Sequence, residues 1–286
     1  PRILIELAIA SGITEIEGGA ICYTIPYSKN FPIDRAIFYW QYVDRLCAEY
    51  STKNRLIHRE SFGPLTATMV PPLIIIVTQL IELLLSAEQG VKSFGVSFGQ
   101  TGSFIQDIAI ADILITKART LLDNNGFEDV NVYLVYHQWM GSFPNERIKS
   151  ESLICLSALI AKFIQADKIV IKTRDEAVGI PSISSNCDAV KQVKYIFNKM
   201  NYDGMINIDK SSLENELLSS QVEYLLDNIF NINGLSFIES VIEAINRGYI
   251  DIPYSPHDSN PNKLQTLRDS NNSIRIKDNG LVPMQE

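Results

Sequence analysis

The chain has 286 residues, of which 46% are hydrophobic and 20% charged, and its formal net charge at pH 7 is −8. This composition is ordinary for a globular protein and supplies enough apolar side chains for a large core. The acidic balance leaves few basic patches, which argues against nucleic acid as a partner.

The chain's cysteines and its most apolar segment indicate a cytoplasmic protein with no membrane partner. The four cysteines are Cys22, Cys47, Cys155 and Cys187. They lie far apart and form no Cys-x-x-Cys pair, which fits a reducing cytoplasm and argues against a zinc site. The most apolar run, residues 73–85, contains Gln79 and Glu82 and is too short to cross a bilayer, so it predicts a buried helix.

The first predicted element is a helix that begins at once. The opening "PRILIELAIASG" has no methionine, and Ile3, Leu4, Leu7 and Ala8 follow one another at helical spacing. A natural chain seldom begins inside such an element. The sequence is therefore expected to be a fragment or a processed chain.

A predicted strand at residues 13–16 is followed by "EGGAICYTIPY". Two adjacent glycines and Pro26 disfavour a helix there, and a buried strand does not need the carboxylate of Glu17, so the segment is predicted to be a loop. The glycines let a ligand approach the backbone, and a carboxylate suits an ammonium group. Tyr23 and Tyr27 could equally be half-buried aromatics with solvated hydroxyls.

Strand and helix patterns then alternate at a spacing of roughly 40 residues, which is typical of a β/α repeat. The predicted strands are residues 13–16, 56–58, 94–98, 130–136 and 168–171. The helices predicted to follow them are residues 34–50, 71–90, 104–126, 145–165 and 189–200.

Parallel β/α units build either an open doubly wound sheet or an eight-stranded barrel. No Gly-x-Gly-x-x-Gly follows a predicted strand, and the unusual residues gather after the strands, where the catalytic face of a barrel lies. The predicted fold class is therefore α/β, a (β/α)8 TIM barrel with about five units present in residues 1–200. Residues 201–286 are predicted to add a C-terminal extension, with helices at residues 213–230 and 235–246 and a loop-rich tail from residue 251.

Several residues after the strands have both a functional and a structural interpretation. Glu60 in "HRESFGPL" could simply pair with Arg59 or another cation. The segment "YHQWMGSFP" could pack on the barrel rim or form an apolar wall for a large planar ligand. Lys172 and Glu176 could be a surface ion pair of little energetic consequence, although an inward lysine at the end of "KIVIKT" is uncommon without a function.

Familiar catalytic motifs are absent from the sequence. The histidines at positions 58, 137 and 257 share no metal-ligand spacing, so no metal site is predicted. The sequence has no Gly-x-Ser-x-Gly and no Gly-x-x-x-x-Gly-Lys. Residue chemistry alone predicts a barrel enzyme that binds a small polar substrate, of a kind that could carry an amino group.

Seven segments resemble, in order and spacing, the large (epsilon) chain of glutamate mutase, also called methylaspartate mutase. They are "EGGAICYTIPYSKN", "WQYVDRL", "HRESFGPLTATMVPP", "SAEQGVKS", "FIQDIA", "YHQWMGSFP" and "IVIKTRDEAVGIP". The resemblance runs to the tail near "DIPYSPHDSNPNK". The family's large chain is a longer barrel, so its N-terminal strands and part of its C-terminal end are expected to be missing here.

The resemblance implies an adenosylcobalamin-dependent mutase that interconverts L-glutamate and 3-methylaspartate by a radical mechanism. In the family, the cofactor supplies an adenosyl radical and the protein supplies binding, orientation and shelter. The sequence lacks the Asp-x-His-x-x-Gly signature of cobalamin-binding domains, which the family carries on a separate small chain. A small cobalamin-binding subunit is therefore an implied partner, in a hetero-oligomer of two large and two small chains.

The resemblance also assigns site residues. Glu17 matches the family position that binds the substrate ammonium and is the catalytic candidate, and Tyr23 and Tyr27 match substrate-contacting tyrosines. The positions that line the cofactor match Pro26, Phe143, Lys172, Glu176 and Ile180. Ala20 stands where a third glycine is usual, and the arginines that hold the substrate carboxylates in the family lie upstream of Pro1.

Two rival functions remain open in the sequence. The Lys172 amine could form a Schiff base, as in barrel lyases of the aldolase type. Alternatively, a truncated, non-catalytic barrel could only bind the cobalamin subunit, which the missing arginines support. Because the carboxylate-binding part is absent, the resemblance limits the substrate to glutamate or a related amino acid.

Overall fold

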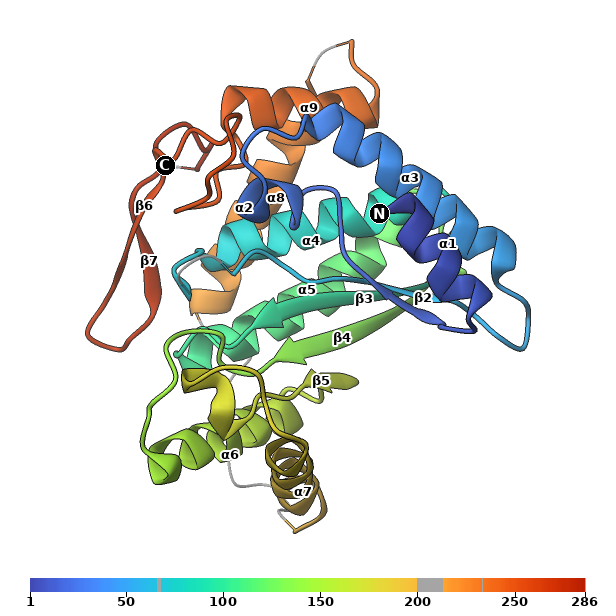
Figure 1. Cartoon of the computed structure of the whole chain (residues 1–286). Helices are drawn as coiled ribbons and strands as arrows, with labels where there is room; N and C mark the ends of the chain where they lie inside the picture. Colours follow the sequence, from blue (N-terminus) through green and yellow to red (C-terminus); the bar gives the residue numbers. More distant parts are fainter. Residues whose placement is uncertain (66–67, 200–212, 233, 286) are drawn as a thin grey trace.

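A curled sheet of parallel strands organises the protein (Figure 1). The computed structural model describes residues 1–65, 68–199, 213–232 and 234–285. The strands are β1 (Glu15–Glu17), β2 (His58–Ser61), β3 (Ser93–Gly99), β4 (Asn131–His137) and β5 (Lys168–Val170), paired in that order and all parallel. The strands follow one another across the sheet in the same order as along the chain, and the curled sheet forms a half-barrel. The predicted α/β class and the five successive units are confirmed.

A helix follows each strand. These helices are α3 (Ile33–Tyr50), α4 (Pro72–Ala87), α5 (Phe104–Asn124), α6 (Arg147–Phe163) and α7 (Ile183–Lys199). In Figure 1, α3 and α4 lie above the strands and α6 and α7 below them. α7 begins six residues earlier than predicted, and its predicted last residue lies outside the described part of the chain.

The predicted N-terminal helix is present as α1 (Arg2–Ala10), which packs against α3. The side chains of Ile3, Leu4 and Leu7 are exposed, whereas Ile5 is buried. The helical spacing in this segment was therefore a correct signal for a helix, but most of the apolar side chains that define it do not face the core. None of the helices in the described residues is long and apolar enough to cross a membrane.

The predicted bounds of the first two strands are wrong by one to three residues. β1 ends at Glu17 and β2 ends at Ser61, so Glu17 and Glu60 are strand residues and not loop residues. In β1 only the central residue, Ile16, is buried. A single buried residue is too short an apolar pattern to place the strand along the chain. The position of β1 is instead set by its parallel pairing with β2, in which Glu17 lies opposite Glu60.

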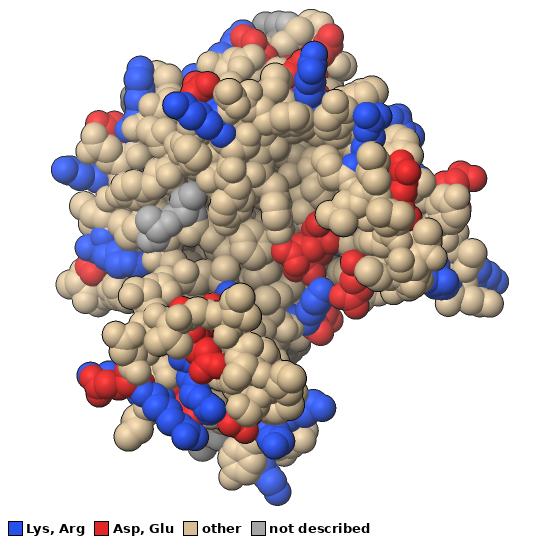
Figure 2. All heavy atoms as spheres, viewed as in Figure 1, with Lys and Arg blue, Asp and Glu red and all other residues tan. Residues whose placement is uncertain are grey.

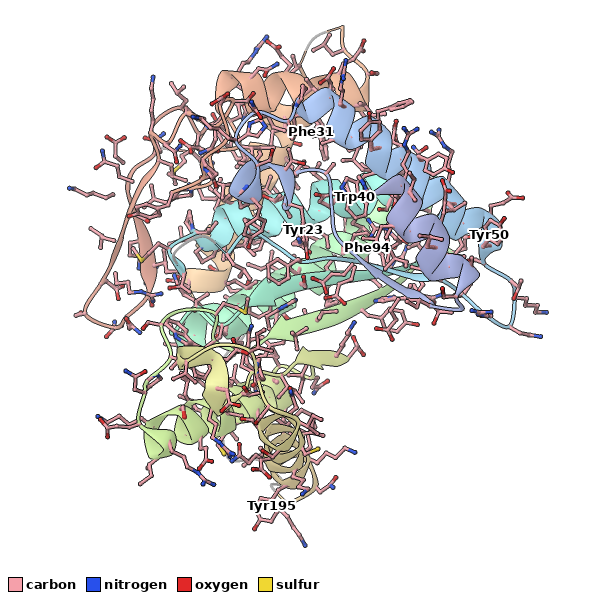
Figure 3. All side chains as sticks on the ribbon, viewed as in Figure 1. Tyr23, Phe31, Trp40, Tyr50, Phe94 and Tyr195 are labelled. Carbon is pink, nitrogen blue, oxygen red and sulfur yellow. The ribbon has the colours of Figure 1, made fainter. Side chains whose placement is uncertain are left out.

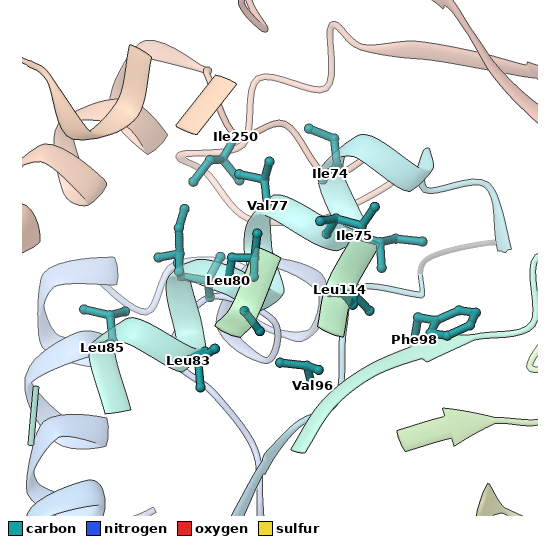
Figure 4. Packing of buried hydrophobic residues seen from close by; sticks show 14 of the residues in the cluster. Ile74, Ile75, Val77, Leu80, Leu83, Leu85, Val96, Phe98, Leu114 and Ile250 are labelled. Carbon is teal, nitrogen blue, oxygen red and sulfur yellow. The ribbon is translucent and has the colours of Figure 1, made fainter. Parts of the chain in front are cut away.

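Helix α4 is the centre of the hydrophobic core (Figure 4). All of its residues are buried, because β2 and β3 cover one side and α5 and α8 (Leu213–Phe230) cover others. The predicted buried helix at residues 73–85 is confirmed. Its three polar side chains in that range have partners: Thr78 bonds the carbonyl of Ile74, Gln79 bonds Ser61 and the backbone of Ser97, and Glu82 accepts from backbone N–H groups.

The C-terminal part packs back on the half-barrel. Helix α8 contacts α4, α5 and α9 (Phe237–Arg247), which begins with a capping box between Ser236 and Glu239. The helices predicted at residues 213–230 and 235–246 are confirmed. The predicted domain boundary between residues 200 and 201 lies outside the described residues.

The tail after residue 251 is mostly loop, as predicted, but it also contains two strands that were not predicted. Strands β6 (Gln265–Arg268) and β7 (Ile274–Asp278) form an antiparallel hairpin. Ile274 exchanges both of its backbone hydrogen bonds with the Gln106 side chain of α5, and this long-range contact was invisible to local patterns. Asp251 is also buried and accepts the backbone N–H groups of Lys263 and Leu264.

A buried carboxylate, Asp107, secures the start of α5. It accepts hydrogen bonds from the Thr101 backbone N–H at 2.9 Å, from the Thr101 hydroxyl at 2.7 Å and from the Tyr136 hydroxyl at 3.2 Å. Burial nevertheless raises the pKa of Asp107 from 3.8 to about 7, because these hydrogen bonds only partly offset the desolvation of the charge.

Asp107→Asn is therefore expected to alter the pH dependence of stability. A folded-state pKa above the unfolded value means that the protonated acid stabilises the fold at low pH, and that this contribution is lost as the pH rises through about 7. Between pH 5 and pH 8, the wild-type free energy of unfolding should fall by about 2–3 kcal/mol relative to that of the variant. Urea unfolding at several pH values measures this difference; parallel curves for the two proteins would contradict it.

Candidate functional site

The face of the sheet that points away from the helices is polar. Arg59 of β2 bonds Asp44 of α3, so its neighbours His58 and Glu60 point the opposite way, into the half-barrel. The ionisable residues of this interior face are Glu15, Glu17, His58, Glu60, Tyr133, His137 and Lys168. In Figure 2, acidic side chains gather beside a hollow near the middle of the surface.

Glu17, Tyr23 and Tyr27 come together at the end of β1. The Tyr23 hydroxyl donates a 2.5 Å hydrogen bond to Glu17 Oε1, and the Tyr23 and Tyr27 rings lie 5.9 Å apart. The Tyr23 ring also contacts Phe62, which follows β2, with 5.6 Å between ring centroids. Figure 3 shows Tyr23 near the centre of the molecule, between α2 (Thr24–Tyr27) and the strands.

Both tyrosines keep their protons at neutral pH. Burial, the hydrogen bond to Glu17 and the nearby charge of that carboxylate raise the pKa of Tyr23 well above its usual range. Burial also raises the pKa of Tyr27. The two hydroxyls are therefore hydrogen-bond donors, and Glu17 supplies the negative charge of this group.

The backbone between Glu17 and Tyr23 makes unusually close contacts. Gly18 has φ +134°, and a Cβ there would collide with the Trp40 ring. A Cβ on Gly19 would collide with the Glu82 carboxylate. The glycine pair therefore permits close packing against protein side chains, whereas the sequence suggested the close approach of a ligand. The segment then forms α2, which was not predicted because Pro26 argued against a helix.

A second polar group lies on the same face, with Glu60 and His137 buried, Glu15 exposed and Lys168 partly exposed to solvent. Lys168 Nζ lies 2.7 Å from Glu15 Oε2 and 2.8 Å from Glu60 Oε2. His137 Nε2 is 3.4 Å from Glu60 Oε1, a contact too poorly aligned to be a hydrogen bond, and the His137 ring packs edge-on against Phe62 at 4.6 Å. Burial favours the neutral acid, but the neighbouring imidazole and ammonium outweigh it and hold the pKa of Glu60 below its ordinary value.

The predicted pairing of Glu60 with a cation is thus confirmed, although the cation is Lys168 and not the adjacent Arg59. Sequence reasoning missed Lys168 and Glu82 as contributors to this region. The alternation in "KIVIK" places Lys168 on the same face of the strand as Val170, which is the signal that could have identified it.

Lys172 and Glu176 form an ion pair beyond the end of β5. Lys172 Nζ lies 3.5 Å from Glu176 Oε2, and both side chains are partly exposed. The Lys172 backbone N–H donates to the Gln138 side chain at 2.9 Å, which ties this segment to the end of β4. The Lys172 ammonium is therefore a hydrogen-bond donor and the Glu176 carboxylate an acceptor at the carboxyl ends of the strands.

The other residues matched to cofactor-lining positions have very different surroundings. Ile180 is 97% exposed, and Phe143 packs on a small apolar cluster formed by Ile154, Ala158 and Val193. Pro26 is buried within α2. The structure brings the Glu17 group together and pairs Lys172 with Glu176, but no direct contact joins these sets among the described residues.

Acidic, histidine and cysteine side chains do not converge as metal ligands in the part of the chain that the structure describes. The four cysteines are free thiols; Cys22 and Cys47 are buried, and Cys187 is exposed. The arrangement can bind a small cationic group at Glu17 and donate hydrogen bonds from Tyr23 and Tyr27.

The chain is similar to known proteins along its whole length. A family model described as "Methylaspartate mutase E chain (MutE)" matches residues 1–286. The chain is 37% identical to the glutamate mutase epsilon subunit of Escherichia coli O157:H7 over 283 residues, and 35% identical to that of Desulfitobacterium hafniense (strain Y51) over 285 residues. It is 33% identical to the epsilon subunit of Halobacterium salinarum over 285 residues.

These alignments cover 99% to 100% of this chain but 59% of each of the three relatives. The chain therefore spans less than two thirds of the length of the curated proteins that it matches.

Proposed function

The chain belongs to the methylaspartate mutase E chain family, and we propose on this basis that it forms part of the large catalytic subunit of a carbon-skeleton mutase. In this proposal the enzyme interconverts L-glutamate and 3-methylaspartate with adenosylcobalamin by a radical mechanism. The fold is then a complete (β/α)8 barrel, and the five described parallel strands are five of its eight.

The observation that carries this proposal is the group formed by Glu17, Tyr23 and Tyr27 on the interior face. A carboxylate with tyrosine hydroxyls beside it suits an amino acid, because the carboxylate attracts the ammonium and the hydroxyls donate to oxygen atoms. In the reaction, Glu17 holds the substrate amino group, and the tyrosines orient the substrate. Phe62 and the Tyr rings exclude water from the reacting carbon atoms.

The residues after β4 and β5 fit a large cofactor with both polar and apolar parts. The Lys172–Glu176 pair offers donors and an acceptor to polar groups, and Phe143 and Ile180 offer apolar surface. When bound, adenosylcobalamin would supply the radical that starts the rearrangement. Pro26, which is buried beside Tyr27 in α2, would contribute to this lining only through the backbone around it.

A small cobalamin-binding subunit is the proposed partner, in an assembly of two large and two small chains. Exposed apolar side chains near the ends of the strands support it: Val178, Ile180 and Ile183 all lie between β5 and the first turn of α7. A second protein placed there would cover them and keep the site dry. The free thiols support a reducing compartment, the cytoplasm.

A conversion assay tests the proposed function. The full-length chain is mixed with the small subunit and adenosylcobalamin, and 3-methylaspartate formation from L-glutamate is followed. We expect turnover that requires both proteins. Turnover by the large chain alone would contradict the two-chain proposal, and no turnover by the assembled proteins would favour a non-catalytic barrel.

The same samples also test the alternative function, a lyase that forms a Schiff base at Lys172. The Lys172 side chain is paired with Glu176 at 3.5 Å, and forming a Schiff base would require this ion pair to break. Borohydride treatment in the presence of a keto acid should leave Lys172 unmodified by mass spectrometry; an adduct at this residue would favour a lyase.

A further inference from the structure

Glu82 is a buried acidic residue in the middle of the most apolar helix of the protein. Its side chain is within α4, which otherwise carries no charged residue, and it is 3% exposed. Its carboxylate accepts three consecutive backbone N–H groups: Ala20 at 3.2 Å, Ile21 at 2.7 Å and Cys22 at 3.1 Å. These N–H groups are buried, so without Glu82 they would lack any comparable acceptor.

Burial raises the pKa of Glu82 to about 6, while the hydrogen bonds from Ile21 and Cys22 act in the opposite direction. Glu82 is therefore mainly ionised at neutral pH, although it lies in the apolar core. A charge in such a place is costly unless hydrogen bonds compensate it. Gly19 completes the arrangement, because any side chain at that position would occupy the space of the carboxylate.

The three anchored residues lie between Glu17 and Tyr23, the two residues that share the 2.5 Å hydrogen bond of the site. On the other side, Arg59 donates to the carbonyl of Ile16 at 2.8 Å and to that of Gly18 at 3.0 Å. Two buried charged side chains thus satisfy the polar groups of this backbone. The Arg59 guanidinium donates to its carbonyls, and the Glu82 carboxylate accepts from its N–H groups.

We propose that Glu82 is a positioning residue that fixes the backbone of residues 18–22 and so sets the separation of Glu17 and Tyr23. It touches no substrate in this role and acts only through the segment that it anchors. The proposal rests on the proposed function for its kinetic consequence, but the anchoring itself is measurable without any turnover.

Thiol protection of Cys22 measures the anchoring directly. Cys22 is buried, and its own N–H donates to Glu82. In the full-length chain, Glu82→Gln replaces one oxygen by an NH2 group that cannot accept, so about one hydrogen bond is lost. The labelling rate of Cys22 by a maleimide, mapped by mass spectrometry, should rise about 5-fold in Glu82→Gln and further in Glu82→Leu.

Two internal references distinguish a local effect from general destabilisation. Cys47 is buried in α3, and no hydrogen bond joins it to Glu82 among the described residues, so its labelling rate should stay unchanged, while exposed Cys187 reports reagent activity. The matched control is Asp251→Asn, which removes another buried carboxylate that accepts backbone N–H groups, in the tail. Equal acceleration at Cys22 and Cys47 in Glu82→Gln would overturn the proposal.

The kinetic measurement uses the same variants assembled with the small subunit. We expect the KM for glutamate to rise about 3- to 10-fold in Glu82→Gln, with the apparent constant for adenosylcobalamin unchanged. Asp251→Asn should lower the Tm without moving either constant. An unchanged KM together with faster Cys22 labelling would show that the segment is anchored but does not set substrate binding, which would also overturn the proposal.

If the wild-type assembly does not convert glutamate, the proposed function fails, and the labelling experiment still decides whether Glu82 anchors the segment. If Glu82→Leu does not fold, Glu82→Gln carries the test, since it conserves the shape of the side chain.

Discussion

Replacing Glu17 by glutamine in the full-length chain, assembled with the small subunit, is expected to lower kcat/KM for glutamate about 10- to 150-fold. The substitution keeps the shape of the side chain and removes its charge. A hydrogen bond to a charged group contributes roughly 1.5–3 kcal/mol, which corresponds to this range. The Tyr23 hydroxyl, which donates to the Glu17 carboxylate, can still donate to the amide oxygen.

Stability separates this role from a structural one. The Glu17 side chain is exposed, and Tyr23 is its one hydrogen-bond partner among the described residues, so the Tm should change little. Glu243→Gln, which removes a partly exposed carboxylate paired with Arg247 on α9, is a matched control that should leave both quantities unchanged. A clear fall in Tm with normal turnover would remove Glu17 from the site.

Replacing Arg59 by methionine is expected to lower the free energy of unfolding by about 3–5 kcal/mol. Arg59 is buried, and its guanidinium forms an ion pair with Asp44 at 2.5 Å. It also donates to the carbonyls of Ile16 and Gly18 and stacks over the Trp40 ring. Methionine fills much of the volume but leaves the Asp44 carboxylate buried, with the Ser86 hydroxyl as its only remaining partner among the described residues. The loss therefore comes mainly from an uncompensated buried charge.

A double variant checks that cause. Adding Asp44→Asn to Arg59→Met removes the stranded charge and should restore part of the lost stability, as urea unfolding would show. Equal stabilities of the single and double variants would mean that the lost contacts to Ile16 and Gly18 dominate instead. A loss below about 1 kcal/mol in the single variant would contradict the estimate altogether.

Local patterns were sufficient for the repeating units but not for their register. The 73–85 run predicted α4 correctly because every residue of that helix is buried, so its apolar content alone was decisive. In β1 only Ile16 is buried, and the strand is placed by its pairing with β2, a partner more than 40 residues away. Single-sequence patterns contain no information on such pairing.

The polar contacts of the interior were harder still to predict. Glu60 has an arginine next to it in the sequence, yet alternate strand residues point to opposite faces, so Arg59 turns towards the helices. Its true partner, Lys168, is 108 positions away. Glu82 looked like an interruption of an apolar helix, because the N–H groups that it accepts belong to a segment 60 to 62 residues earlier.

The close packing of the glycine pair also bears on how proteins of this kind could diverge. Residues 18–22 fit between Trp40 on one side and Glu82 on the other, with no room for an added side chain at either glycine. An insertion or deletion there would move three N–H groups away from their shared acceptor. New substrate preferences would therefore have to arise by exchanging the side chains that project from this segment, such as Tyr23 and Tyr27, while its backbone path is inherited unchanged.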